Sequence, residues 1–273
     1  MPYTHSGELG DIWKHLPLCD ILKIEVPIRY HETNSAYAGY TIKGAPRTEY
    51  GILKLLAEGN VAFTNSTYCK ALRKNGIEQM YYTGSPGLAM SILGNSANYF
   101  FHDLEREALD SVAAFASERS LKAEIFHGDS ICAFLDDGYQ LNENDFVFLD
   151  PYSPLDNNEQ DFNFFDIFDK AIRASSKTLM WYGYMTIAGQ QEILGNLRGI
   201  AEASGIAIST FDLWQKDMSI NPGVPGCGLA CANVSEESVS ALTQYLCLVE
   251  EWYATAEYMG SPATLLTQIN HYR

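Results

Sequence analysis

Residues 145–155, Asp-Phe-Val-Phe-Leu-Asp-Pro-Tyr-Ser-Pro-Leu, form the stretch of this chain best suited to chemistry. The apolar run Phe146–Leu149 predicts a buried strand that delivers Asp150, Pro151 and Tyr152 at its carboxyl end. The aspartate can accept a hydrogen bond or a proton, the proline leaves the preceding carbonyl free, and the tyrosine offers a flat face for stacking. Such a trio could hold an amine on a planar ring. The alternative is a strand ending in a turn, with the aspartate as turn former or helix cap.

The elements around this stretch predict how it is positioned. Strands alternate with helices along the chain, which favours an α/β fold with a mostly parallel, doubly wound sheet. Such sheets bind ligands outside the carboxyl ends of their strands. We expect the first strand at Val26–Glu32, the last at Gly228–Asn233 and a closing helix at Ser238–Tyr253.

Polar residues also follow other predicted strands. Asp103 ends a strand at 97–102, and Asp129 follows one at 123–127. An acidic residue at the end of the second strand commonly binds ribose hydroxyls in this fold class. Both aspartates could instead cap the helices that follow them. The first strand leads into Glu32-Thr-Asn-Ser-Ala-Tyr-Ala-Gly39, where small residues can meet a nucleotide-type ligand, although the glycine-rich fingerprint is absent.

Residues 41–80 predict a helical insertion with helices near Tyr50–Glu58 and Ser66–Lys74. Between Thr41 and Asn75 there are six basic and two acidic residues, although the whole chain has a formal net charge of −16. A local basic patch is what a polyanion needs, but a solvated helix pair explains the same charges equally well. The basic residues are Lys43, Arg47, Lys54, Lys70, Arg73 and Lys74.

Composition sets the class of protein. With 273 residues, 47% of them hydrophobic, the chain predicts a single elaborated domain spanning 1–273. Its acidity argues against non-specific nucleic-acid binding. None of the six cysteines forms a Cys-x-x-Cys pair and no histidine cluster accompanies them, so we expect no metal site and a reducing cytoplasm. The polar start, Met1–His15, and the lack of an 18-residue apolar run predict neither a signal peptide nor a membrane span.

Short motifs in a specific order resemble the RlmJ family of large-subunit ribosomal RNA adenine-N6 methyltransferases. They are Tyr3-x-His-Ser, Gly7-x-x-x-Asp-Ile-x-Lys-His15, Glu32-Thr, Tyr82-x-Gly-Ser-Pro, Phe101-His-Asp-Leu, His127-Gly-Asp, Leu149-Asp-Pro, Leu179-x-Trp-Tyr and Gly226-x-Gly-Leu. The resemblance spans nearly the whole chain. It implies a Rossmann-like class I methyltransferase sheet with a small helical insertion after the first strand, and S-adenosylmethionine as cofactor.

The resemblance also implies roles for individual residues. Asp150 would be the catalytic acceptor, flanked by Pro151 and Tyr152, and Tyr3 would lie near the target base. The residues implied at the cofactor are Lys14, His15, Glu32, Asn34, Ser85, Asp103, Asp129 and Ser130. For RNA, the expected partner, the basic residues Lys43, Arg47, Lys70, Arg73 and Lys74 would supply contacts.

The chain departs from the family at two places. The family's Asp-Pro-Pro-Tyr is Asp150-Pro-Tyr-Ser here, and the glycine-rich first loop holds Ala36, Tyr37 and Ala38. Three hypotheses therefore stay open. The protein methylates N6 of a flipped adenine in RNA, it methylates a different acceptor, or it is a non-catalytic binding module that keeps the fold.

Overall fold

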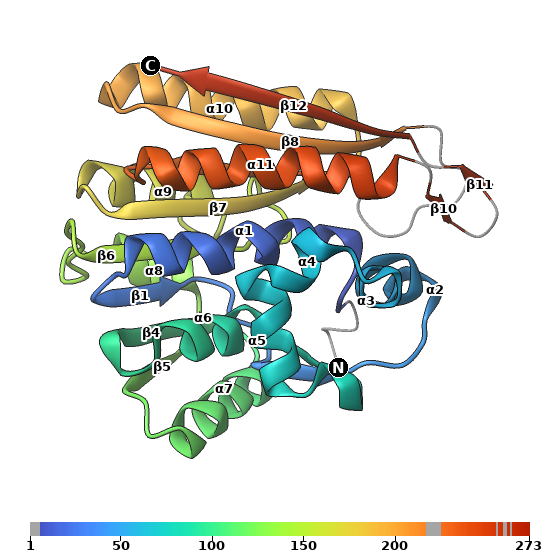
Figure 1. Ribbon diagram of the computed structural model, residues 1–273. Helices are drawn as coiled ribbons and strands as arrows, with labels where there is room; N and C mark the ends of the chain where they lie inside the picture. Colours follow the sequence, from blue (N-terminus) through green and yellow to red (C-terminus); the bar gives the residue numbers. More distant parts are fainter. Residues whose placement is uncertain (1–5, 217–224, 255, 259–260, 263) are drawn as a thin grey trace.

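The computed structural model describes residues 6–216, 225–254, 256–258, 261–262 and 264–273. An eight-stranded sheet lies at its centre, with helices on both faces (Figure 1). Across the sheet the strands are β12 (Thr264–Tyr272), β8 (Ile208–Lys216), β9 (Gly226–Ala232), β7 (Lys177–Tyr184), β6 (Asp145–Leu149), β1 (Arg29–Glu32), β4 (Asn98–Asp103) and β5 (Ala123–His127). From β5 to β7 all neighbours are parallel, whereas β9 and β12 run antiparallel to their neighbours. The predicted Rossmann-like, mostly parallel sheet is confirmed.

The strand order reverses at β1. The chain passes from β1 to β4 and β5 on one side, and then returns to β6 on the other side of β1. In doubly wound sheets, the crevice outside the carboxyl ends of the strands at such a reversal is where ligands bind. The residues that follow β1 and β6 therefore face the same crevice.

The centre of the sheet is apolar on both faces. All five residues of β6 are buried, as a parallel strand covered on both sides requires. Phe146 and Phe148 belong to one hydrophobic core, and Val147 and Leu149 to the other. Successive side chains of a strand point to opposite faces, so β6 anchors both cores and fixes where Asp150 emerges.

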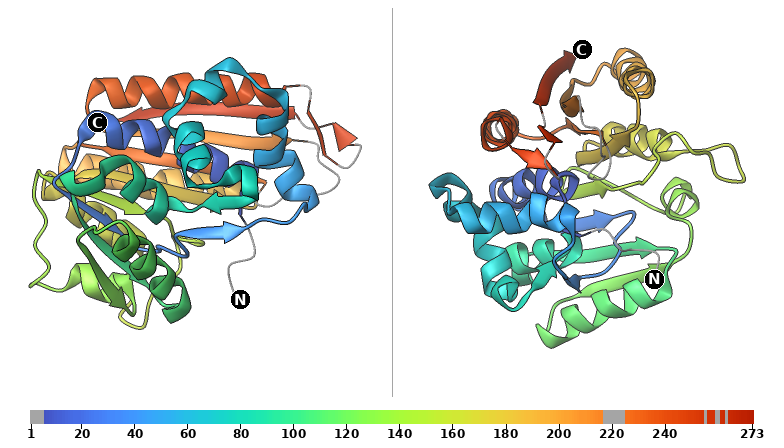
Figure 2. Two further views of the ribbon diagram at one scale, coloured as in Figure 1. Left: turned by 60° about the horizontal axis from the view of Figure 1, so that its bottom comes forward. Right: turned by 90° about the vertical axis from the view of Figure 1, so that its right-hand side faces the viewer.

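Two helical layers cover the sheet, as the right-hand view of Figure 2 shows. One layer consists of α1 (Leu9–Glu25), α6 (Ser85–Leu93), α7 (Arg106–Glu118) and α11 (Glu236–Tyr253). The other consists of α8 (Ser130–Leu135), α9 (Phe164–Arg173) and α10 (Ile187–Ser204). None of the helices in the described ranges is long and apolar enough to cross a membrane.

Helix α1 is the centre of the first layer. It packs against α5 (Thr67–Asn75), α6 and α11. Asp20 on α1 accepts hydrogen bonds from Thr67 on α5 and from Tyr245 on α11. The amino-terminal helix is thus held from two sides by later parts of the chain.

The segment after β1 forms a two-stranded antiparallel sheet, β2 (Gly39–Thr41) with β3 (Tyr81–Thr83), and the helices between them. In Figure 1, α2 and α3 lie at the end of the molecule toward which β1 points, and α4 and α5 lie in front of the sheet. The helical elements are α2 (Pro46–Thr48), the π-helical turn Glu49–Leu53, α3 (Lys54–Glu58), α4 (Val61–Asn65), α5 (Thr67–Asn75), and a 3-10 turn at Ile77–Gln79; another 3-10 turn, Gly94–Ser96, follows α6.

Two predicted boundaries are wrong. Gly228–Asn233 is not the last strand, because β10 (Glu257–Tyr258), β11 (Ser261–Pro262) and β12 follow it. β12 escaped prediction because it is an edge strand whose Leu266 and Ile269 remain exposed, which blurs the apolar alternation. The first strand begins at Arg29 rather than Val26, because Val26 ends α1 in a left-handed conformation with φ 40°.

Candidate functional site

A cavity of about 490 Å³ lies at the strand-order reversal, beyond the carboxyl ends of β1 and β6. Its wall is formed by α1, by the loop that joins β1 to β2 (the first loop), by the start of α6, by the end of β6 and by β7. The lining residues are Asp11, Lys14, His15, Asn34, Ser35, Ala36, Tyr37, Tyr40, Tyr82, Gly84, Ser85, Asp150, Tyr152 and Trp181. The sequence-predicted Lys14, His15, Asn34, Ser85, Asp150 and Tyr152 therefore meet in one place.

Asp150 is held by Lys14. The Nζ atom of Lys14 donates to Oδ2 of Asp150 at 2.6 Å, and lies 3.3 Å from Oδ1 of Asp11. The same ammonium lies 5.4 Å from the ring centre of Trp181. Because α1 places Asp11 and Lys14 three residues apart, both side chains project from one face of the helix toward the end of β6.

The charges of Lys14, Asp11 and Asp150 influence one another's pKa. Burial would lower the pKa of Lys14, but the carboxylates of Asp150 and Asp11 raise it overall, so the lysine is a cation. Burial raises the pKa of Asp150, and the Lys14 ammonium opposes that rise. The lysine therefore favours the ionised form of the carboxyl that the sequence singles out as an acceptor.

His15 is neutral and hydrogen-bonded at one nitrogen. Its Nδ1 lies 2.8 Å from the hydroxyl of Tyr82, which lies 2.9 Å from the hydroxyl of Tyr68. Burial and the adjacent Lys14 lower the pKa of the imidazole. Its Nε2 is buried and has no hydrogen-bond partner within the described part of the chain.

Glu32 lies beneath the cavity rather than in its wall. The side chain is fully buried and accepts hydrogen bonds from Ser85 Oγ at 2.5 Å and Tyr30 Oη at 2.9 Å. Burial raises its pKa far above the usual value. Glu32 thus positions Ser85, which does line the cavity.

A second cavity of about 320 Å³ adjoins the first. Asn34 and Tyr152 border both, so the two form one divided groove along the carboxyl edge of the sheet. The phenol of Tyr152 is 86% exposed at this boundary. Asp129 and Ser130 line the second cavity, together with Leu104, Gly128, Asp156, Asn158 and Phe164 among others.

The two strand-end aspartates differ in position. Asp129 caps α8 by accepting from the amide of Ile131 at 2.8 Å, and it also lines the second cavity. Asp103 lines neither cavity and accepts from the backbone amides of Ala36 at 2.7 Å and Glu105 at 2.8 Å. Asp103 therefore fixes the first loop and the turn into α7.

The backbone of the first loop packs directly against Gly84, which follows β3, and against Gly87 on α6. A side chain at Gly84 would overlap the carbonyl oxygen of Tyr37, and one at Gly87 would overlap that of Ala38. Ala36 has φ 52°, in the left-handed region that favours glycine. The loop thus keeps a glycine-like path even though alanine occupies this position.

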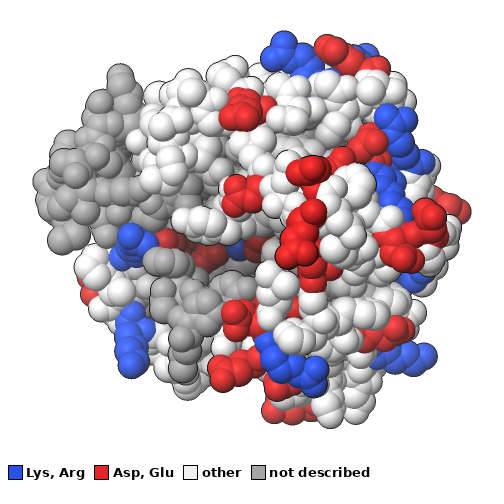
Figure 3. Space-filling model, turned by 180° about the vertical axis from the view of Figure 1, so that it is seen from behind, with Lys and Arg blue, Asp and Glu red and all other residues white. Residues whose placement is uncertain are grey.

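The predicted basic residues line neither cavity of the groove. Lys43 precedes α2 and Arg47 lies in it, whereas Lys70, Arg73 and Lys74 lie on α5. Arg47 lies 3.6 Å from Glu8, and Arg73 lies 3.7 Å from Glu78. Figure 3 shows acidic and basic side chains interspersed on the face it displays. Tyr3, predicted near the target base, lies outside the described residues.

Sequence reasoning missed several wall residues. No role at the site was predicted for Asp11, although its spacing of three from Lys14 in a helix could have indicated an ion pair. Trp181, Tyr37 and Tyr40 give the cavity aromatic walls. Their positions in the wall depend on contacts between segments distant in sequence, which local patterns do not encode.

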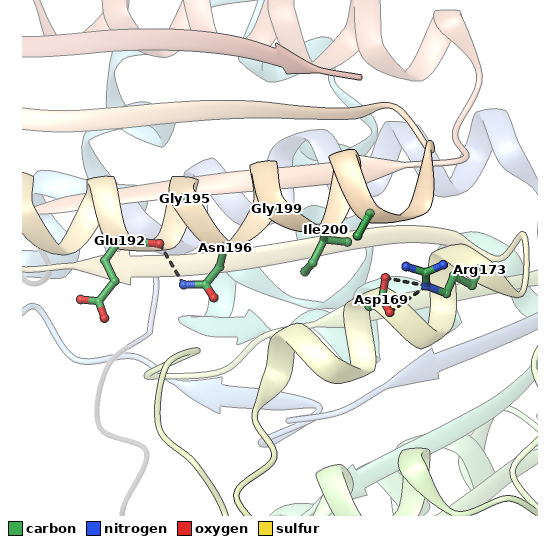
Figure 4. Close-up of a pocket in the computed structure, with 8 residues that line it drawn as sticks. Asp169, Arg173, Glu192, Gly195, Asn196, Gly199 and Ile200 are labelled. Atoms are coloured by element: carbon green, nitrogen blue, oxygen red, sulfur yellow. Dashed lines mark hydrogen bonds and ion pairs between the residues drawn. The ribbon is translucent and has the colours of Figure 1, made fainter.

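Other hollows lie outside this groove. A cavity of about 870 Å³ adjoins it at Gly128 and Asp129 and extends along β5 and α8. A cleft of about 560 Å³ lies between α9 and α10, where Asp169 and Arg173 pair across from Gly195 and Gly199 (Figure 4). Within the residues described, no group of three or more His, Cys, Asp and Glu side chains could hold a metal ion.

Comparison with known proteins gives a structural likeness without a close relative in sequence. No family model matches the chain, and no curated protein does. A Legionella pneumophila protein described with the family model DUF519 has a TM-score of 0.74 and 21% identity, covering 97% of this chain and 98% of that one. The two proteins share their fold over nearly all of both chains.

Two weaker structural matches are a probable spermidine synthase and an O-methyltransferase. The synthase, from Corynebacterium glutamicum, has a TM-score of 0.46 and 10% identity, covering 94% of this chain and 74% of that one. The O-methyltransferase, from Streptomyces achromogenes and solved in complex with S-adenosylmethionine, has a TM-score of 0.41 and 14% identity, covering 80% and 79%.

Proposed function

We propose that this protein is an S-adenosylmethionine-dependent methyltransferase that acts on an exocyclic amine, with N6 of adenine in RNA as the acceptor. The observation that carries the proposal is the position of Asp150. It stands at the strand-order reversal, bound by Lys14, in the wall of a groove with aromatic sides. The motif resemblance supports the choice of amine and base.

The residues along the groove fit this cofactor. The cofactor is elongated, and the groove offers it two joined chambers that meet at Asn34 and Tyr152. His15, Asn34 and Ser85 would hold the methionine portion in the first chamber, and His15 offers a buried nitrogen without a partner in the described structure. Asp129 and Ser130 would hold the adenosine portion in the second. When bound, the cofactor supplies an activated methyl group on its sulfonium.

The chain's own residues would orient the acceptor. Tyr152 is exposed at the groove boundary, where a flipped base could stack on its ring. Asp150 and its backbone carbonyl would accept hydrogen bonds from the amine. Lys14 would keep Asp150 ionised for that purpose. The protein's contribution is thus positioning and charge stabilisation.

A second candidate, methylation of a non-RNA acceptor, is favoured by the charge around the groove. The loop after β6 carries exposed Asp156, Glu159 and Asp161, and Glu107 lies exposed at the start of α7. These carboxylates would repel phosphates near the site, whereas RNA binding would depend on the basic residues of the insertion.

Binding and transfer experiments test both candidates. We expect calorimetric titration to give micromolar affinity for S-adenosylmethionine and for its demethylated product. Asp150→Ala should abolish methyl transfer to adenine-containing RNA and leave cofactor affinity within about threefold, since the carboxyl acts on the acceptor. Tyr152→Phe, which keeps the stacking surface, is the matched control and should retain transfer, whereas Tyr152→Ala should lose most of it.

The outcomes separate the hypotheses. Transfer to RNA that weakens steeply with salt supports the RNA acceptor. Cofactor binding with transfer only to small molecules or proteins supports the second candidate. Absence of cofactor binding at millimolar concentration would contradict both methyltransferase candidates and leave the hypothesis of a binding module with this fold.

A further inference from the structure

A chain of three buried polar side chains ends at the wall of the first cavity. Tyr68 on α5, Tyr82 on β3 and His15 on α1 are each at most 3% exposed. Tyr68 and Tyr82 hydroxyls are 2.9 Å apart, and Tyr82 hydroxyl and His15 Nδ1 are 2.8 Å apart. Nε2 of His15 has no partner in the described structure, and His15 lines the cavity.

The number of protons restricts the directions that the hydrogen bonds among these three side chains can take. Two phenols and one neutral imidazole bring three protons to two hydrogen bonds. One proton is left outside the chain, on Tyr68, on Tyr82 or on Nε2 of His15. If it stays on either tyrosine, that hydroxyl proton and the bare Nε2 both lack a partner. If it lies on Nε2, the N–H is the one group left without a partner.

Unsatisfied buried polar groups are costly, so the arrangement with one such group is the stable one. In it Tyr68 donates to Tyr82, and Tyr82 donates to Nδ1 of His15. Burial raises the pKa of both phenols and lowers that of the imidazole, so all three members are neutral, as the count requires.

We propose that Tyr82, oriented by Tyr68, locks His15 in the tautomer protonated at Nε2, which then donates a hydrogen bond to a carboxylate oxygen of the bound ligand. This inference rests on the proposed function, in which that ligand is the methionine portion of S-adenosylmethionine. A ligand group that can only donate is disfavoured at this position. Tyr82 and Tyr68 are positioning residues, since they act through His15.

Two measurements test the proposal separately. The first is the tautomer, read from nitrogen–proton correlation spectra of full-length protein with ¹⁵N-labelled histidine, with His15→Gln identifying the signal. We expect wild type without ligand to show a protonated Nε2 and an unprotonated Nδ1 at neutral pH. Tyr82→Phe should give a mixture of tautomers. Tyr99→Phe is the matched control, because it also removes a phenol donor, to Gly94 O, from a buried ring, and it should leave the His15 signal unchanged.

The second measurement is the preference for S-adenosylmethionine over its decarboxylated form, taken as a ratio of dissociation constants. We expect this ratio to fall about tenfold in Tyr82→Phe and to stay constant in Tyr99→Phe, since the ratio depends on a hydrogen bond to a charged group.

A protonated Nδ1 in wild type, with cofactor binding intact, overturns the tautomer lock while the proposed function stands. An unchanged ratio in Tyr82→Phe overturns the carboxylate assignment. If wild type binds neither compound, the carboxylate assignment fails together with the proposed function. The spectrum still tests whether Tyr82 fixes the tautomer of His15.

Discussion

Nζ of Lys14 and Oδ2 of Asp150 are 2.6 Å apart across 136 residues of sequence. The contact joins the amino-terminal helix to the end of the central strand β6 and sets a cation beside the proposed acceptor. In a buried setting such a pair is justified by what it does to ionisation more than by the stability it adds.

Lys14→Met should move the acid limb of the pH–rate profile upward. Burial raises the pKa of Asp150 and Lys14 holds that rise back, so removing the cation raises the pKa further. Because the ionised carboxyl is the active form, the rate should then fall at a higher pH, by roughly one unit or more. Lys14→Arg keeps the cation and should shift the limb far less. An acid limb identical in wild type and Lys14→Met would contradict this role for Lys14.

Gly84→Ala should destabilise the protein and weaken ligand binding together. The added Cβ would overlap the carbonyl oxygen of Tyr37, so the first loop must move away from the cavity. We expect a loss on the order of 2 kcal/mol in the free energy of unfolding. Gly199→Ala on α10 is the control, since its Cβ meets nothing within 4 Å, and it should be neutral or stabilise by about 0.5–1 kcal/mol. Urea denaturation of both variants provides the comparison, and equal effects would refute the close-approach argument.

Ala36→Gly should stabilise the protein slightly. Ala36 holds φ 52°, which costs an L-residue about 1–2 kcal/mol. Glycine removes that strain but gains freedom in the unfolded chain worth about 0.4–1 kcal/mol, so the net gain should be around 0.5 kcal/mol. The thermal midpoint should rise by a few degrees at most, with cofactor affinity unchanged or improved. A lower midpoint would show that the loop is relaxed with alanine in place.

Asp145→Asn should cost stability in a pH-dependent way. Burial alone would raise the pKa of Asp145, but His31 and the two-nitrogen contact from Arg29 lower it overall. A carboxyl with a depressed folded-state pKa stabilises above its unfolded value of about 3.9 and loses that contribution as the pH falls. We expect a loss on the order of 3 kcal/mol at pH 7 that shrinks toward pH 3.

The matched control for that substitution is Asp169→Asn. Asp169 pairs with Arg173 in an exposed i,i+4 contact on α9. Exposed pairs of this kind contribute about 0.3–0.5 kcal/mol, so the control should change little at any pH. Denaturant midpoints measured from pH 7 down to pH 3 distinguish the two sites; a constant cost for Asp145→Asn would exclude the ionic contribution.

The sequence predicted the parts of the fold that have strong local patterns. The apolar run of β6 and the alternation of strands and helices placed the sheet and the end of β6 correctly. β12 was missed because its stability comes from pairing along β8, a contact with no local signature. Local apolar patterning cannot report which edge a strand will join.

The candidate site was predictable in outline only. Strand ends identified Asn34, Asp129 and Asp150, because parallel strands deliver their carboxyl ends to one edge. The ion pair with Lys14 and the wall formed by Trp181 depend on how α1 and β7 approach β6 in space. Asp103 shows the converse, since its strand-end position was correct but its carboxylate binds the backbone of the first loop.

Helix α1 is held by a hydrogen bond from Tyr245 of α11 to Asp20, and the two residues are 225 positions apart in the chain. Closing so long a loop costs entropy before any packing is gained, so we expect this contact to form late. The contacts of α1 with α5 and α6 join segments much closer in sequence and should form before it. The helix that presents Lys14 and His15 would therefore be fixed from both sides only in the last stage of folding.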